Sequence, residues 1–103
     1  MTVEFINKDL QELYETGHSR KYKKVPEIIM PKLYKAVRHF EYAETIQDIW
    51  KIGSLHFEKL VGIDRYSVRL DIRWRLEMKI EWENKDCTVG IIGLTDLTKH
   101  YGD

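Results

Sequence analysis

The sequence predicts an α+β domain in which two N-terminal helices pack on one face of a mostly antiparallel sheet of four to five strands. Two observations lead to this fold. Residues 66–82 alternate without error between apolar and polar side chains, which is the period of a β-strand, whereas apolar residues at helical spacing occur within residues 7–42. At 103 residues the chain can build one hydrophobic core, so we expect a single domain over residues 1–103.

The N-terminal segment carries the signals of a strand followed by a helix. Thr2 to Ile6 is a short β-prone run. Asn7 then suits a helix N-cap, and Gly17 suits a helix end. The basic stretch 18–24 contains almost no apolar residue, so it is expected to form a loop or a frayed helix end.

A second helix is expected from about Pro26 to Tyr42, where apolar side chains form one stripe. Pro31 is tolerated there if the helix begins near residue 28 or later, or if it kinks. Thr45 to Ile49 can add a short third turn, capped by its threonine. Leu55 to Leu60 then continues as a β-like segment.

The alternating run 66–82 is too long for one strand of so small a domain, since it would extend ~56 Å at ~3.3 Å per residue. It must therefore fold into a hairpin, with Asp71-Ile72-Arg73 as the turn. A three-residue loop pairs Leu70 with Trp74 and keeps the apolar positions of both strands on one face. A two-residue turn would bury Arg75 and expose Trp74, so it is rejected.

This register places like charges opposite one another on the polar face of the hairpin. Arg69 lies opposite Arg75, an arrangement that destabilises a sheet. One interpretation is a face that binds an anion; the other is a solvated outer face whose cations are partly neutralised by Glu77 and Glu81. In both, the polar face is open to solvent or ligand. The other expected pairs on this face are Arg65 with Lys79 and Ser67 with Glu77.

After the hairpin, a turn at residues 84–86 leads into Cys87 to Leu94, which is apolar enough for a central strand despite Gly90 and Gly93. Asp96 to Tyr101 is expected to end the chain as a short helix or a fixed tail.

The charge of the chain is balanced as a whole but uneven along the sequence. It has 17 basic and 17 acidic residues, so the total charge indicates no nucleic-acid partner. Residues 1–16 hold four acids and one lysine, whereas residues 18–38 hold seven cations and one acid. Cys87 is the only cysteine, which excludes an internal disulfide. With no membrane-length apolar run and no signal-peptide pattern, we expect a soluble, cytoplasmic protein that contacts no membrane.

Three local strings, together with this layout, resemble the RelE/ParE superfamily of toxin–antitoxin modules, and most closely its HigB-like branch. The likeness covers nearly the whole chain, and the middle string is the most specific. The strings are residues 57–62, residues 66–69 followed by 74–76, and residues 96–101.

The resemblance implies a toxin of a type II module: an endoribonuclease that cuts messenger RNA on the ribosome, inhibits translation and uses no metal or other cofactor. It also implies a cognate antitoxin of the helix-turn-helix type. The protein would contact operator DNA only through this antitoxin. The alternatives that remain open are a ParE-like inhibitor of DNA gyrase and a non-catalytic binding protein of the same fold. The histidines and Cys87 match no zinc-ligand spacing, so no metal site is expected.

Carried over by position, the catalytic residues implied are Arg69, Arg75, His100 and Tyr101. Cleavage through the ribose 2′-hydroxyl needs a base, an acid and cations beside the phosphorane. An arginine fork suits the phosphate, and an imidazole titrates near neutral pH, so it can serve as base or acid. Tyr101 can stack on a base or assist proton transfer.

Other basic residues are expected to bind the RNA backbone. In HigB-like proteins a lysine often precedes the glycine matched here by Gly62, but this chain has Val61; Lys59 can replace that lysine if the strand parity permits. Glu58 is either a general base or the partner of a surface salt bridge. The expected RNA-binding residues are Lys59, Arg65, Arg73, Lys79, Lys99, Arg20, Lys21, Lys23 and Lys24.

Overall fold

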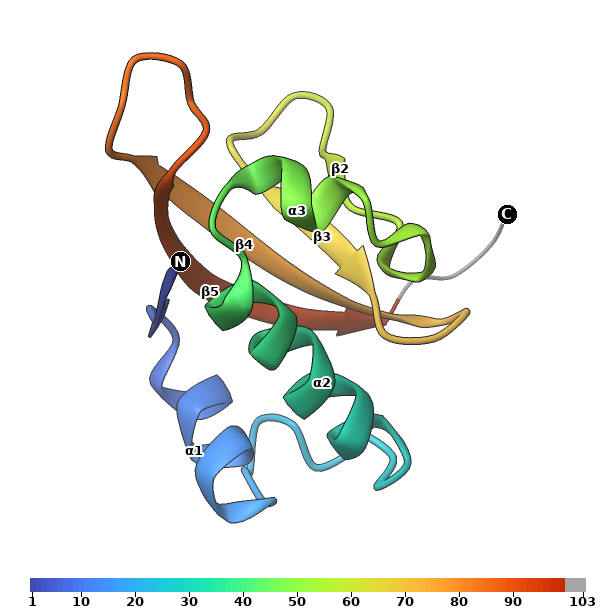
Figure 1. Cartoon of the computed structure of the whole chain (residues 1–103). Coiled ribbons are helices and arrows are strands. Elements are labelled where there is room, and N and C mark those ends of the chain that lie inside the picture. The colour runs from blue at the N-terminus through green and yellow to red at the C-terminus, as the bar shows by residue number, and fades with distance from the viewer. Residues whose placement is uncertain (100–103) are drawn as a thin grey trace.

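The fold is known from a computed structural model, which describes residues 1–99 (Figure 1). The helices precede most of the sheet along the chain. In order, the elements are β1 (Thr2–Phe5), α1 (Lys8–Thr16), α2 (Ile29–Tyr42), α3 (Ile46–Trp50), the 3₁₀ turn η1 (Gly53–Leu55), β2 (Glu58–Lys59), β3 (Tyr66–Arg69), β4 (Trp74–Trp82) and β5 (Gly90–Lys99).

The five strands form one sheet in the order β1-β5-β4-β3-β2. β1 runs parallel to β5, and every other neighbouring pair is antiparallel. The expected α+β fold with a mostly antiparallel sheet is therefore confirmed.

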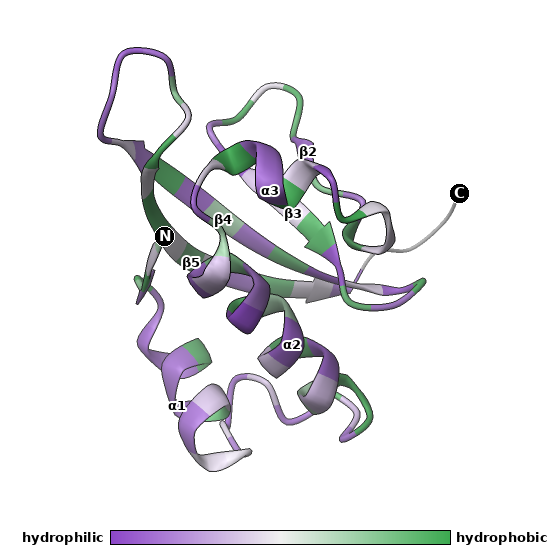
Figure 2. Cartoon of the chain, viewed as in Figure 1, coloured by the Kyte–Doolittle hydropathy of each residue, from purple (hydrophilic) through white to green (hydrophobic). Residues whose placement is uncertain are grey.

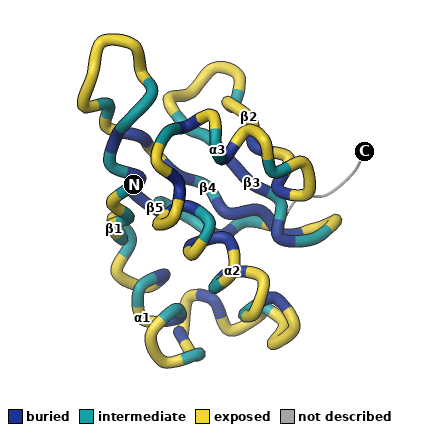
Figure 3. The backbone as a smooth tube through the Cα atoms, in the orientation of Figure 1, coloured by how far each residue is buried: buried dark blue, intermediate teal, exposed yellow. Residues whose placement is uncertain are grey.

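The helices and the sheet enclose one hydrophobic core. α2 crosses the sheet with its apolar stripe inward, and α1 packs beside it (Figure 1). Along β4 the green and purple segments of Figure 2 alternate, as expected for a strand with one apolar face. Figure 3 shows the buried segments on β4, β5 and the inner side of α2. The fully buried side chains include Phe40, Leu33, Leu76, Met78, Ile92 and Leu94.

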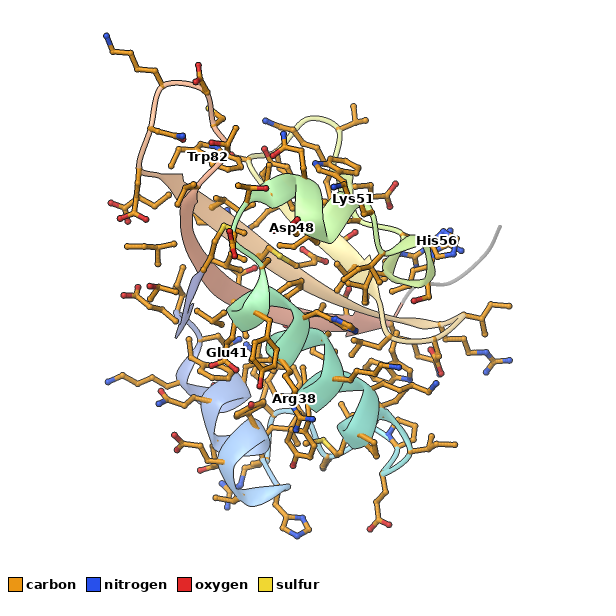
Figure 4. All side chains as sticks on the ribbon, in the orientation of Figure 1. Arg38, Glu41, Asp48, Lys51, His56 and Trp82 are labelled. Carbon is orange, nitrogen blue, oxygen red and sulfur yellow. The ribbon has the colours of Figure 1, made fainter. Side chains whose placement is uncertain are left out.

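The helix ends follow the local signals in the sequence. The Asn7 side chain accepts hydrogen bonds from the first turn of α1, and Gly17 ends that helix at a φ of 83°. α2 begins at Ile29 rather than Pro26, so Pro31 falls in the first turn, where backbone N–H groups have no helical partner anyway. Asp48 closes a capping box on α3 by accepting from Thr45 N at 3.1 Å (Figure 4).

Two expectations for the second half of the chain are wrong. In the β-like segment 55–60, Leu55 is the last residue of η1 and only Glu58–Lys59 form a strand. Residues 96–99, expected as a helix or tail, continue β5. The register between β4 and β5 shifts so that Thr95 is an extra residue, a β-bulge. Because of this bulge, Leu94 and Leu97 both face the core although they are three residues apart. In the sequence, apolar residues at this spacing resemble the pattern of a helix.

Close packing against Gly90 makes this glycine necessary for the pairing of β5 with β4. A Cβ there would lie 2.6 Å from the carbonyl oxygen of Glu81, a backbone atom that cannot rotate away. Gly93 is the matched control, because its Cβ would collide only with the Ile6 side chain, which can rotate away, while the nearest backbone atom lies at an ordinary contact distance of 3.8 Å. We expect Gly90→Ala to lower the free energy of unfolding by about 1–3 kcal/mol, and Gly93→Ala by clearly less. Urea denaturation of the two variants checks this; equal losses would contradict it.

Among residues 1–99, no helix is long and apolar enough to cross a membrane.

Candidate functional site

The hairpin of β3 and β4 has the register that the alternation predicts. Arg69 pairs with Arg75, and Ser67 pairs with Glu77. The Leu70 N–H donates to the Trp74 carbonyl at 2.8 Å, which closes the predicted three-residue loop. The Asp71 side chain stabilises that loop, accepting from the backbone N–H groups at positions 73 and 74. The pairing of the two arginines is therefore confirmed.

The polar face of this hairpin is not open at the arginine end, contrary to the expectation. Arg75 is 8% exposed and Ser67 is 1% exposed, while Arg69 is half-buried. Ser67 is short and stands between Glu58 and Glu77 on the neighbouring strands, so longer side chains screen it from water. Arg75 is on the strand between β3 and β5 and has a paired residue on each side.

Three polar atoms on this face are buried without a hydrogen-bond partner in the part of the chain that the structure describes: Ser67 Oγ, Arg69 Nε and Arg75 Nη1. The three residues are neighbours in the register of β3 and β4. A buried donor without an acceptor costs about 1–3 kcal/mol, and a charged donor costs more. An acceptor that reached these donors would remove this cost, so the unpartnered donors favour the anion-binding interpretation of the paired arginines.

Carboxylates lie beside this cluster on the same face. Glu58 pairs with Ser67 across β2 and β3, so the two side chains share a face, and Glu58 is exposed. Glu77 accepts a hydrogen bond from Thr98 Oγ1 at 3.0 Å. From the sequence alone, Glu58 is either a general base or one partner of a surface ion pair. Its pairing with Ser67 is what brings it next to the arginines.

HigB-like proteins often have a lysine at the position that Val61 occupies in this chain. Lys59 cannot substitute for that lysine. It pairs with Tyr66, so it lies on the helix side of the sheet, and its Nζ is 5.5 Å from the centre of the Tyr66 ring. Strand parity therefore separates Lys59 from Arg69 and Arg75.

The remaining basic residues of the hairpin region do not form one group. The expected pair of Arg65 with Lys79 is not formed, because the β3–β4 ladder ends at Tyr66 and Met78. Lys79 is on the polar face but lines a separate cavity of about 340 Å³ together with three carboxylates. Arg73 is exposed at the hairpin tip, and Lys99 is exposed opposite Trp74. His100 and Tyr101 lie outside the described residues.

The basic loop between α1 and α2 is attached to the sheet by a buried tyrosine. Tyr22 OH donates to Asp96 Oδ1 at 2.7 Å and accepts from Asn7 Nδ2 at 2.7 Å. Burial, and secondly the hydrogen bond to Asp96, raise the pKa of the Tyr22 phenol far above its usual value. Asn7 Nδ2 also donates to the carbonyl of Thr95, the bulge residue of β5. Sequence reasoning missed this network, because no local pattern connects the three segments.

The four cations of that loop, Arg20, Lys21, Lys23 and Lys24, are all exposed. Arg20 and Lys23 line a cavity of about 480 Å³ that also contains Glu12 and Glu27, so its charge is mixed. Among residues 1–99, no three metal-binding side chains converge; His56, at the end of η1, projects outward (Figure 4).

No protein-family model and no curated protein matches the chain. Among solved structures it is similar to a YoeB/ParE toxin from Agrobacterium tumefaciens, with a TM-score of 0.61 and 14% sequence identity. The alignment covers 98% of this chain and 100% of that one. At this identity the likeness establishes a shared fold, and it confirms the RelE/ParE-like fold expected from the sequence.

Proposed function

We propose that this chain is the toxin of a type II toxin–antitoxin module and cleaves messenger RNA on the ribosome, as a HigB-like member of the RelE/ParE superfamily. The observation that carries this proposal is the group of buried donors on Ser67, Arg69 and Arg75, which lack an acceptor among the described residues. The shared fold with a YoeB/ParE toxin supports it.

In the proposed reaction the arginines bind the phosphate to be cleaved. The 2′-hydroxyl of the preceding ribose loses its proton, and its oxygen attacks the phosphorus. The bond to the 5′-oxygen breaks as that oxygen takes up a proton, which leaves a 2′,3′-cyclic phosphate and a 5′-hydroxyl. Arg69 and Arg75 stabilise the charge on the phosphorane, because a guanidinium stays protonated and donates to two oxygens at once.

The proton transfers require a base and an acid beside this phosphate. Glu58 is an exposed carboxylate next to Ser67 on the same face, which suits a base. His100 and Tyr101, implied by the family resemblance, are the candidates for the acid and for stacking on a base of the RNA. This assignment uses no metal ion.

The proposed partners follow from the same site. Messenger RNA in the ribosome supplies the phosphate, and a cognate helix-turn-helix antitoxin would silence the toxin by covering Arg69 and Arg75 with an acceptor of its own. Operator DNA would be contacted only through that antitoxin. Pairing Arg75 with a partner carboxylate would satisfy the donor that is unpaired in the described chain.

Induced expression of the chain in a bacterial host tests the proposal. We expect growth to stop within a few generations, and primer extension to reveal new 5′ ends inside translated reading frames. DNA breaks with intact transcripts would instead indicate a gyrase inhibitor, and normal growth alongside a stable partner complex would indicate a non-catalytic binding protein. Either of those results would exclude the nuclease.

A further inference from the structure

A cationic cavity lies at the end of the hairpin, where the end of β3 approaches α2. It has a volume of about 240 Å³ and is bounded by α2, η1 and the end of β3. In Figure 1 the hairpin tip and η1 both lie on the side of α2 that faces away from α1. Its lining includes Lys32, Lys35, Ala36, His39, Ser54 and Arg69.

The helix period explains why three basic side chains of α2 reach this cavity together. Lys32, Lys35 and His39 are three and four residues apart, so they lie along one face of the helix. That face borders the apolar stripe, and buried Ala36 lies between them. Like charges at this spacing repel each other, so these side chains do not stabilise the helix itself.

No acidic side chain lines this cavity in the part of the chain that the structure describes. This separates it from the cavities beside Lys79 and beside Arg20, both of which contain carboxylates. Lys32, Lys35 and Arg69 are cationic side chains, and the hydroxyl of Ser54 adds a neutral donor. Three cations and no carboxylate in the lining of the cavity form an environment that favours an anion of high charge density.

We propose that this cavity binds a phosphate group of the RNA backbone next to the phosphate that is cleaved. The inference rests on the proposed function and adds a subsite to it. Arg69 connects the two positions, because it pairs with Arg75 across the hairpin and also lines the cavity. The RNA backbone then runs from the polar face of β3 and β4 around the end of β3 to the basic face of α2.

The test measures binding without cleavage. The probe is a short fluorescein-labelled single strand whose 2′-hydroxyls are methylated, so that it cannot be cut through the 2′-oxygen. We expect the double variant Lys32→Ala/Lys35→Ala to bind it about 10-fold more weakly at low salt. The slope of log K against log salt should become shallower by roughly 0.7 for each phosphate that the variant no longer neutralises.

The control is Lys8→Ala/Lys85→Ala, which removes the same charge from α1 and from the loop between β4 and β5. Both lysines are exposed, lie outside this cavity and are not among the expected RNA-binding residues. It should leave the salt slope unchanged. An equal weakening of binding in the two double variants would show diffuse attraction and overturn the subsite.

Titration with inorganic phosphate, followed through the backbone amide signals of Ser54 and Leu55, identifies the source of the ligand. Displacement of phosphate by the RNA probe supports the backbone as the ligand. Phosphate binding that the RNA does not compete with overturns that assignment. If the cavity binds RNA while the protein cuts none in cells, the subsite stands and the nuclease proposal fails.

Discussion

Arg75→Met is expected to abolish growth arrest and to slow RNA cleavage by about 10²–10³-fold, the loss seen when a preorganised donor to transition-state charge is removed. The fold should remain as stable as before or become more stable. Arg75 is 8% exposed and its Nη1 has no partner among the described residues, so the folded state bears the cost of a buried cation with one unsatisfied nitrogen. Methionine removes that cost and fills a similar volume.

Opposite changes in activity and stability distinguish a binding role for Arg75 from a structural one. Urea denaturation gives the stability, and primer extension of transcripts after induction gives the cleavage. Lys85→Met is the control, since Lys85 is exposed beyond the other end of β4, is not among the expected RNA-binding residues and should change neither quantity by much. A clear loss of stability with retained toxicity in Arg75→Met would show that the arginine supports the fold and does not act on RNA.

The pairing of the arginines could be predicted because an uninterrupted two-residue period leaves few registers for a hairpin. A three-residue loop was the one choice that kept Trp74 inside, and Leu70 does pair with Trp74. Helix ends were predictable for a similar reason: Asn7 and Gly17 act within one turn of their own position. In both cases the information is local in the sequence.

The burial of the site was not predictable, because it depends on neighbours that are distant in sequence. Whether Ser67 is covered depends on Glu58 and Glu77 from two other strands. The face occupied by Lys59 depends on the register of a two-residue strand. A β-bulge at Thr95 changes which residues of β5 face the core, and no residue type in the sequence predicts this bulge. The expectation of an open arginine face was wrong for this reason.

Tyr22→Phe is expected to lower the free energy of unfolding by about 2 kcal/mol, because it removes a hydrogen bond to a carboxylate and one to an amide. Tyr22 is buried, and its hydroxyl joins the basic loop to Asp96 of β5 and to Asn7, the N-cap of α1. Tyr42→Phe is the control, since Tyr42 is 80% exposed. A loss in Tyr22→Phe no larger than in that control would mean that the network adds nothing to stability.

The pH dependence of the free energy of unfolding provides an independent test of the role of Tyr22. In the folded protein the pKa of Tyr22 is raised above its unfolded value of about 10, by burial first and by Asp96 second. The stability gained from the neutral phenol is therefore fully present below about pH 10 and is lost as the pH rises toward the folded pKa. Phenylalanine cannot ionise, so the stability difference between the wild-type protein and Tyr22→Phe should be constant from neutral pH to about pH 9 and should narrow above pH 10. Urea midpoints of both proteins, measured across that pH range, check this prediction. A stability difference that widens with pH would show that the folded protein stabilises the phenolate of Tyr22. That result would contradict the hydrogen bond that Tyr22 donates to Asp96.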